Sequence, residues 1–93
     1  MFPGLTTKLS RSTIASTTTI SPKTDIVYVT GTVAIATINP SFGGGQSGLC
    51  ILVPQGAFTT VTTGNIAIAS TATAGKAMIM TYDVTLGKWY PSY

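Results

Sequence analysis

The feature that most constrains the fold is an uncharged run of fifty residues, 26–75, which contains no Asp, Glu, Lys or Arg. Within this run the pattern Gly-[Thr/Asn]-[Val/Ile]-Ala-Ile-Ala occurs twice, beginning at Gly31 and at Gly64. Its many Thr, Val and Ile residues are β-branched and fit poorly into a helix. No segment shows apolar residues at the 3.6-residue period of a helix, so the run predicts β-strands.

Strands are expected wherever apolar or β-branched residues are bounded by Gly, Pro or Asn. The expected strands cover residues 13–19, 26–29, 33–38, 49–53, 58–63, 66–69, 77–82 and 88–90. Short strands at intervals of about 8–12 residues are typical of a sandwich or a barrel. The prediction is therefore an all-β protein, a small antiparallel sandwich or barrel, with residues 13–93 forming a single β domain.

The two copies of the repeat predict two different faces, because successive side chains of a strand point in opposite directions. The large aliphatic residues of each copy are expected to fill a core. The alanines on the opposite face are small enough to let another backbone come close. They are the first candidate subunit contacts: Ala34, Ala36, Ala67 and Ala69.

The composition raises the question of what covers the surface. Only seven of the 93 residues are charged, and 44% are hydrophobic, whereas about a quarter of an average chain is charged. The 18 Thr and 8 Ser residues cover part of the outside, and we expect other copies of the chain to bury much of the rest. Aromatic residues near the chain end add further candidate contacts: Trp89, Tyr90 and Tyr93. Alternatively, Trp89 caps the core, or these rings form a sugar-binding platform.

Residues 1–12 differ from the rest of the chain, with Pro3, Gly4 and no apolar period. We expect them to form an N-terminal docking arm. Its apolar anchors would be Phe2 and Leu5, and its charge contacts Lys8 and Arg11. The formal net charge of +3 favours docking onto an acidic surface. The cations are too dispersed for a nucleic-acid patch.

Catalytic and metal-binding patterns are missing from the sequence. There is no His, and Asp25 and Asp83 are expected at strand ends beside turns. The lone Cys50 is interpreted as a small buried hydrophobe. The glycine loop, residues 41–48, lacks the Lys of a phosphate-binding loop. We therefore expect no enzyme activity, no cofactor and no metal. With no signal peptide and no apolar stretch of membrane-spanning length, we also expect synthesis in a cytoplasm and no membrane partner.

Four stretches of the sequence resemble small β-rich structural modules of tailed bacteriophages. They are GTVAIATINP (31–40), LCILVPQGAFTT (49–60), GNIAIAST (64–71) and GKAMIMTYDVTLGKWYPSY (75–93), together about two-thirds of the chain. Such modules occur in tail fibres, spikes and small virion proteins, and they typically assemble as trimers. The resemblance implies a homotrimer located in the virion. Its partner would be the major capsid protein or another virion protein.

Three functions agree with this sequence. A capsid decoration (cement) protein fits best, because the chain combines a docking arm with a compact β body. A tail fibre, spike, neck or head-fibre component is the alternative. A carbohydrate-binding module, based on Trp89 and the tyrosines, is the third.

Overall fold

The computed structural model describes residues 10–40 and 45–93, and these residues contain strands but no helix. The predicted all-β class is therefore confirmed. The strands are β1 (Arg11–Ala15), β2 (Thr19–Ile20), β3 (Ile26–Thr30), β4 (Thr37–Ile38), β5 (Gly48–Pro54), β6 (Thr59–Thr60), β7 (Ser70–Thr71), β8 (Met78–Asp83) and β9 (Lys88–Pro91).

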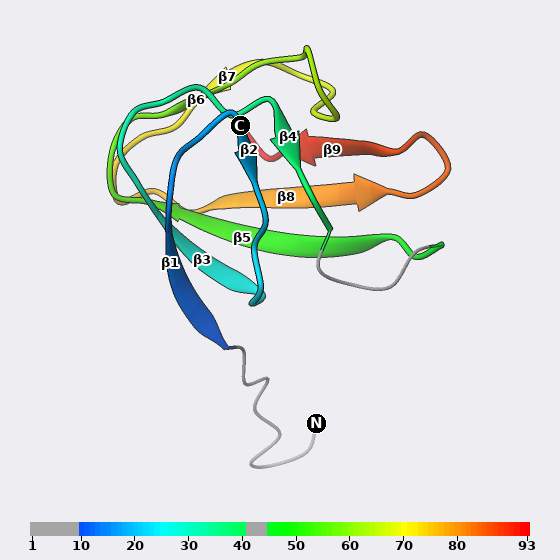
Figure 1. Cartoon of the computed structure of the whole chain (residues 1–93), viewed down its shortest axis with the longest axis horizontal. Coiled ribbons are helices and arrows are strands. Elements are labelled where there is room, and N and C mark those ends of the chain that lie inside the picture. The colour runs from blue at the N-terminus through cyan, green and yellow to red at the C-terminus, as the bar shows by residue number, and fades with distance from the viewer. Residues whose placement is uncertain (1–9, 41–44) are drawn as a thin grey trace.

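Five strands form the main sheet, in the order β1-β3-β5-β8-β9 (Figure 1). Strands β1, β3 and β5 are parallel, whereas β8 and β9 are antiparallel. The short strands pair separately, β2 with β4 in parallel and β6 with β7 antiparallel. The predicted antiparallel order is thus wrong for two of the four neighbouring strand pairs in the main sheet, and the described strands do not close into a barrel.

The parallel order arises because the chain makes successive passes that stack on one another. Each pass consists of one strand of the main sheet and the segment that follows it on the opposite side of the core. Arg11 lies opposite Ile26, and Ile26 lies opposite Ile51. After each of these strands the chain crosses to the other side of the core, where β2 pairs with β4 and Ile35 forms a bridge with Thr60. Each pass therefore starts again from the same end of the sheet, which makes neighbouring strands parallel.

Glycine is required at the corner where these passes stack. Gly31 has a φ of 85°, in the left-handed region that glycine adopts readily. A Cβ added to Gly31 would lie 2.9 Å from the Oγ of Ser16, and one added to Gly56 would lie 2.6 Å from the carbonyl oxygen of Gly31. The corners of consecutive passes thus pack directly against each other, which leaves no room for larger residues.

The core lies between the inner face of the main sheet and the segments that cross opposite it. The sheet contributes Val27, Val29, Cys50, Leu52, Met78, Met80 and Trp89. The opposite side contributes Ile20, Ile35, Ile38, Phe58, Ile66 and Ala72. Most of these side chains are completely buried, so a single chain encloses an apolar core without help from another subunit.

The predicted alternation of the two repeats is wrong. Ile35 and its neighbour Ala36 are both buried, and in the second copy Ile66 is buried whereas Ile68 is 56% exposed. The backbone is not regularly extended here, because the N–H groups of Ala36 and Thr37 both donate to the carbonyl oxygen of Thr18, at 2.8 and 3.0 Å. Two successive residues therefore face the same way.

The two repeats instead meet each other through Asn65. Its side-chain amide donates to the carbonyl oxygen of Ile38 at 2.7 Å and accepts the N–H of Ile38 at 2.8 Å. The backbone N–H of Asn65 donates to the carbonyl oxygen of Ala36 at 3.1 Å. Trp89 joins this network, because its Nε1 donates to the carbonyl oxygen of Ile38 at 2.9 Å and its backbone N–H donates to Asn65 at 2.8 Å.

Candidate interaction surface

The main sheet has a second face, directed away from the core, which we call the outer face. Its side chains alternate with the buried ones along each strand. In the register of the sheet, Ile26, Ile51 and Ile79 lie side by side on three strands, and Tyr28 lies beside Val53. Leu49, Thr81 and Tyr90 form a third row. The outer face is therefore apolar across the centre of the sheet.

Much of this face is accessible to solvent. Leu49 is 59% exposed and Ile79 is 44% exposed, while Ile51 and Tyr90 are half-buried. An exposed apolar patch rimmed by polar residues is typical of an interaction surface. The outer face is accordingly the strongest candidate for contact with another protein.

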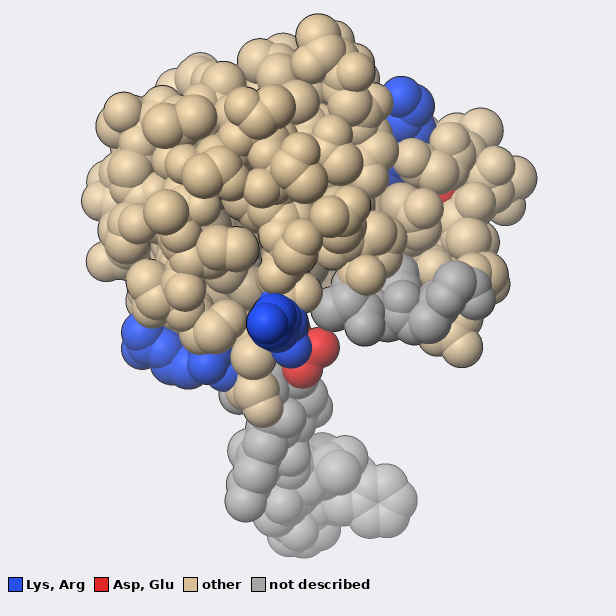
Figure 2. Space-filling model, in the orientation of Figure 1, with Lys and Arg blue, Asp and Glu red and all other residues tan. Residues whose placement is uncertain are grey.

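Charged groups lie at the margin of the outer face. The Arg11 guanidinium lies 3.7 Å from the centre of the Tyr28 ring, a cation–π contact that holds this cation over the neighbouring strand. Asp83 and Lys88 lie opposite each other at the far end of β8 and β9. The other side of the molecule is similarly poor in charge: Figure 2 shows Lys, Arg, Asp and Glu only at the periphery of the visible face.

The predicted subunit contacts are only partly in position. Tyr90 lies on the outer face, and Ala69 is exposed elsewhere on the surface, while Ala34 and Ala67 are half-buried. Ala36 and Trp89 are buried inside the single chain, with 6% and 1% of their surfaces exposed. They have no surface to offer a second subunit, so these two contact predictions are wrong.

The aromatic residues near the chain end do not form a platform. Trp89 packs in the core, with its ring centre 5.0 Å from that of Tyr82, so its ring has no open face for a sugar. The Tyr93 hydroxyl donates to the carbonyl oxygen of Lys76 at 2.6 Å, and the Lys76 ammonium lies 4.4 Å from the centre of the Tyr93 ring. Trp89 and Tyr93 therefore both make their contacts within the chain.

The expected docking arm lies largely outside the described residues, including Phe2, Leu5 and Lys8. Arg11 and Ser12 belong to β1. The β structure therefore begins at Arg11, two residues earlier than the predicted start of the β domain at Thr13, because Arg11 and Ser12 take part in the parallel pairing with β3.

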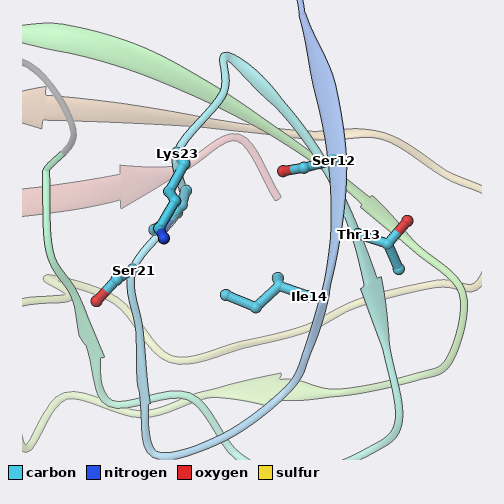
Figure 3. Close-up of a pocket in the computed structure, with 6 residues that line it drawn as sticks. Ser12, Thr13, Ile14, Ser21 and Lys23 are labelled. Atoms are coloured by element: carbon cyan, nitrogen blue, oxygen red, sulfur yellow. The ribbon is translucent and has the colours of Figure 1, made fainter.

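A shallow pocket lies beside β1, where Ser12 and Ile14 face the segment that follows β2. The segment contributes Ser21, Pro22 and Lys23 (Figure 3). In Figure 3 the side chain of Ile14 points into the gap between the two segments, whereas Thr13 points to the other side of β1. The pocket therefore lies at the open edge of the stack of passes.

The carboxylates of Asp25 and Asp83 lie beside strand ends, and the thiol of Cys50 lies in the core. Asp83 accepts the backbone N–H of Thr85 at 2.9 Å in the β8–β9 turn, and Asp25 directly precedes β3. The described residues bring together no group of three His, Cys, Asp or Glu side chains that would hold a metal ion. Cys50 is buried, as predicted. Burial raises the pKa of its thiol to about 11, and the charge of Asp25 adds to this effect.

The Cys50 thiol is accordingly expected to be inert in the folded protein. Because the thiolate is the reactive form, iodoacetamide at pH 8 should modify unfolded protein in guanidinium quickly and folded protein very slowly. Mass spectrometry of timed samples measures both rates. Equal rates would contradict the buried placement of Cys50.

The same pKa shift predicts a pH dependence of stability. Between the ordinary thiol pKa of 9.0 and about 11, the unfolded state loses this proton first. The folded state then binds more protons, so the free energy of unfolding falls as the pH rises. Denaturant titrations should show a steeper fall for the parent protein than for Cys50→Ala across this range.

Comparisons with known proteins add no relative. No family model matches the chain, and neither the curated proteins nor the solved structures contain a significant match. In the part of the chain that the structure describes, no helix has the length and apolar character needed to cross a membrane.

Proposed function

We propose that this chain is a structural protein of a bacteriophage virion, a capsid decoration (cement) protein that assembles as a homotrimer on the shell. The observation that supports assembly into an oligomer is the apolar outer face, with Ile26, Ile51 and Ile79 in one row. An exposed apolar patch is one of the marks of a protein–protein interaction site. The resemblance of four sequence stretches to phage modules supports the virion and the number three.

In this proposal the outer faces of neighbouring copies pack together. The segments opposite the main sheet then form the second layer of a sandwich, directed away from the subunit contact. The residues that precede β1 reach the major capsid protein or another virion protein. The protein has no catalytic role, and it is made in the host cytoplasm.

A single charge on the outer face should prevent this assembly. The variant Ile79→Lys places an ammonium group in the middle of the apolar rows, where packing against a second copy would remove it from water. Its side chain is 44% exposed within one chain, so the isolated fold should tolerate the change. Sedimentation velocity at micromolar concentration should show a smaller species than the parent.

The matched control is Leu86→Lys. Leu86 is 61% exposed and lies in the turn between β8 and β9, away from the apolar rows. This variant should sediment like the parent protein. If Ile79→Lys also sediments like the parent, the outer face is not the subunit contact.

Electron microscopy of purified particles tests the location. Density over the whole capsid that disappears when the gene is deleted would support a decoration protein. Density confined to the tail or neck would favour a fibre, spike, neck or head-fibre component instead. Particles without the protein would exclude both roles.

A further inference from the structure

The open edge of β1 is a second surface of the chain that could bind another strand, through backbone N–H and C=O groups. Strand β1 pairs with β3 on one side, and no other described strand pairs with its other side. The carbonyl oxygen of Ser10 and the N–H of Ser16 both point to β3, where they bond Ile26 and Thr30. Since backbone groups alternate along a strand, those of Arg11, Thr13 and Ala15 point to the open edge.

This edge lacks the usual protection against pairing. Proteins commonly block exposed edges with charged residues, prolines or bulges. Strand β1 contains no proline, and all five of its residues follow the regular register with β3. Its single charge, on Arg11, is held over the Tyr28 ring of the neighbouring strand and so leaves the edge accessible.

We propose that the β1 strands of two copies pair antiparallel about a two-fold axis at Thr13, which joins their main sheets into one. In this register Thr13 lies opposite its counterpart, and Arg11 lies opposite Ala15 of the other copy. All three edge-facing residues then form hydrogen-bonded pairs. A shift by two residues in either direction leaves one of them without a partner. It also brings the two Arg11 side chains closer together if the shift is toward the amino end.

Charge and shape favour a second copy as the occupant. In the central register no two like charges lie opposite each other, which would be destabilising. On the inner side, the small Ser12 of each copy lies opposite the larger Ile14 of the other. Ser12 and Ile14 both line the pocket beside β1 (Figure 3), so the pairing places the Ile14 of one copy beside the Ser12 of the other on this side of the sheet. The contact is therefore self-complementary, as a two-fold interface must be.

This contact is independent of the outer face. The two-fold axis is perpendicular to the sheet, so the outer faces of both copies remain on the same side. If copies also form an oligomer through their outer faces, pairing of the β1 strands joins two such oligomers. A failure of one contact therefore leaves the other to be measured separately.

Disulfide trapping tests the register directly. Opposite residues in a hydrogen-bonded pair have Cα atoms about 5.5 Å apart, within the range that a disulfide spans. Full-length Thr13→Cys should form a covalent dimer under mild oxidation, and Cys50 should not interfere because it is buried. Thr71→Cys, at an exposed position in β7, reports random collisions. If Thr13→Cys dimerises no faster than Thr71→Cys, the pairing is wrong.

A proline at the same position provides a second test. Thr13→Pro removes one edge-facing N–H but no bond to β3, so the fold should be retained. Thr13→Val keeps the N–H and the β-branched shape. Sedimentation should give the parent mass for Thr13→Val and half that mass for Thr13→Pro. Identical masses for all three proteins would overturn the proposal.

Discussion

Replacing Trp89 by Ala is expected to destabilise the protein by about 3–5 kcal/mol, the usual cost of removing a large aromatic side chain from a packed site. Trp89 is 1% exposed and packs among the core residues of both sides. Domains of this size have about 5–15 kcal/mol in total. A thermal melt of the variant should therefore show a markedly lower midpoint than the parent, and an unshifted midpoint would contradict the core placement.

The variant Trp89→Phe separates packing from hydrogen bonding. It keeps an aromatic ring but loses the Nε1 donor to Ile38. The carbonyl oxygen of Ile38 still accepts a hydrogen bond from Asn65, so this variant should lose less stability than Trp89→Ala. A loss as large as that of Trp89→Ala would show that the hydrogen bond, and not the packing, dominates.

Replacing Gly64 by Ala is the second change with a large expected effect. An added Cβ would collide with the carbonyl group of Ala36 and with the Oγ1 of Thr37. One obstacle is backbone, which cannot rotate away, so the segment must shift and disturb the neighbouring Asn65 bonds. Forced expansion of a packed site costs about 1–3 kcal/mol, which a denaturant titration would measure.

The neighbouring residue supplies the control for Gly64. Thr63 is exposed, so Thr63→Ala should change the free energy of unfolding by no more than about 0.5 kcal/mol. Equal stability of Gly64→Ala and the parent would mean that the two repeats do not pack as closely as described.

The long strands of the main sheet could be predicted from the sequence. Residues 26–29, 49–53 and 77–82 differ from β3, β5 and β8 by no more than one residue at either end. The turn between β8 and β9 falls in the gap between the expected strands 77–82 and 88–90. In these segments, apolar side chains alternate or run together between clear turn residues, so the local pattern decides the structure.

The order of the strands could not be predicted, because local pattern does not show where the chain crosses the core. The alternating residues of the two repeats led to long strands at 33–38 and 66–69. In the first segment the structure has only the two-residue strand β4. In the second it has no strand within 66–69, and β7 begins at the next residue. In the first segment, the N–H groups of residues 36–38 donate to the carbonyl oxygen of Thr18 and to the side chain of Asn65. In the second segment, the N–H of Ala67 donates to the carbonyl oxygen of Trp89. Nothing in the sequence around Asn65 distinguishes it from an ordinary turn residue.

Contact with other copies of the chain stays a prediction, and two of the residues expected there, Ala36 and Trp89, are buried in the core. Low charge predicts that other copies cover part of the chain, and the apolar outer face agrees with this prediction. Its central residues, Leu49, Ile51 and Ile79, were assigned to strands but not to a contact. Selecting them requires the sheet register, which places them beside one another on neighbouring strands.

The mass of the full chain in solution tests the central claim most directly. Native mass spectrometry at micromolar concentration should detect a stable homo-oligomer, with the trimer as the expected unit and larger species where β1 strands pair. A monomer of 9.6 kDa as the only species would contradict assembly through either surface.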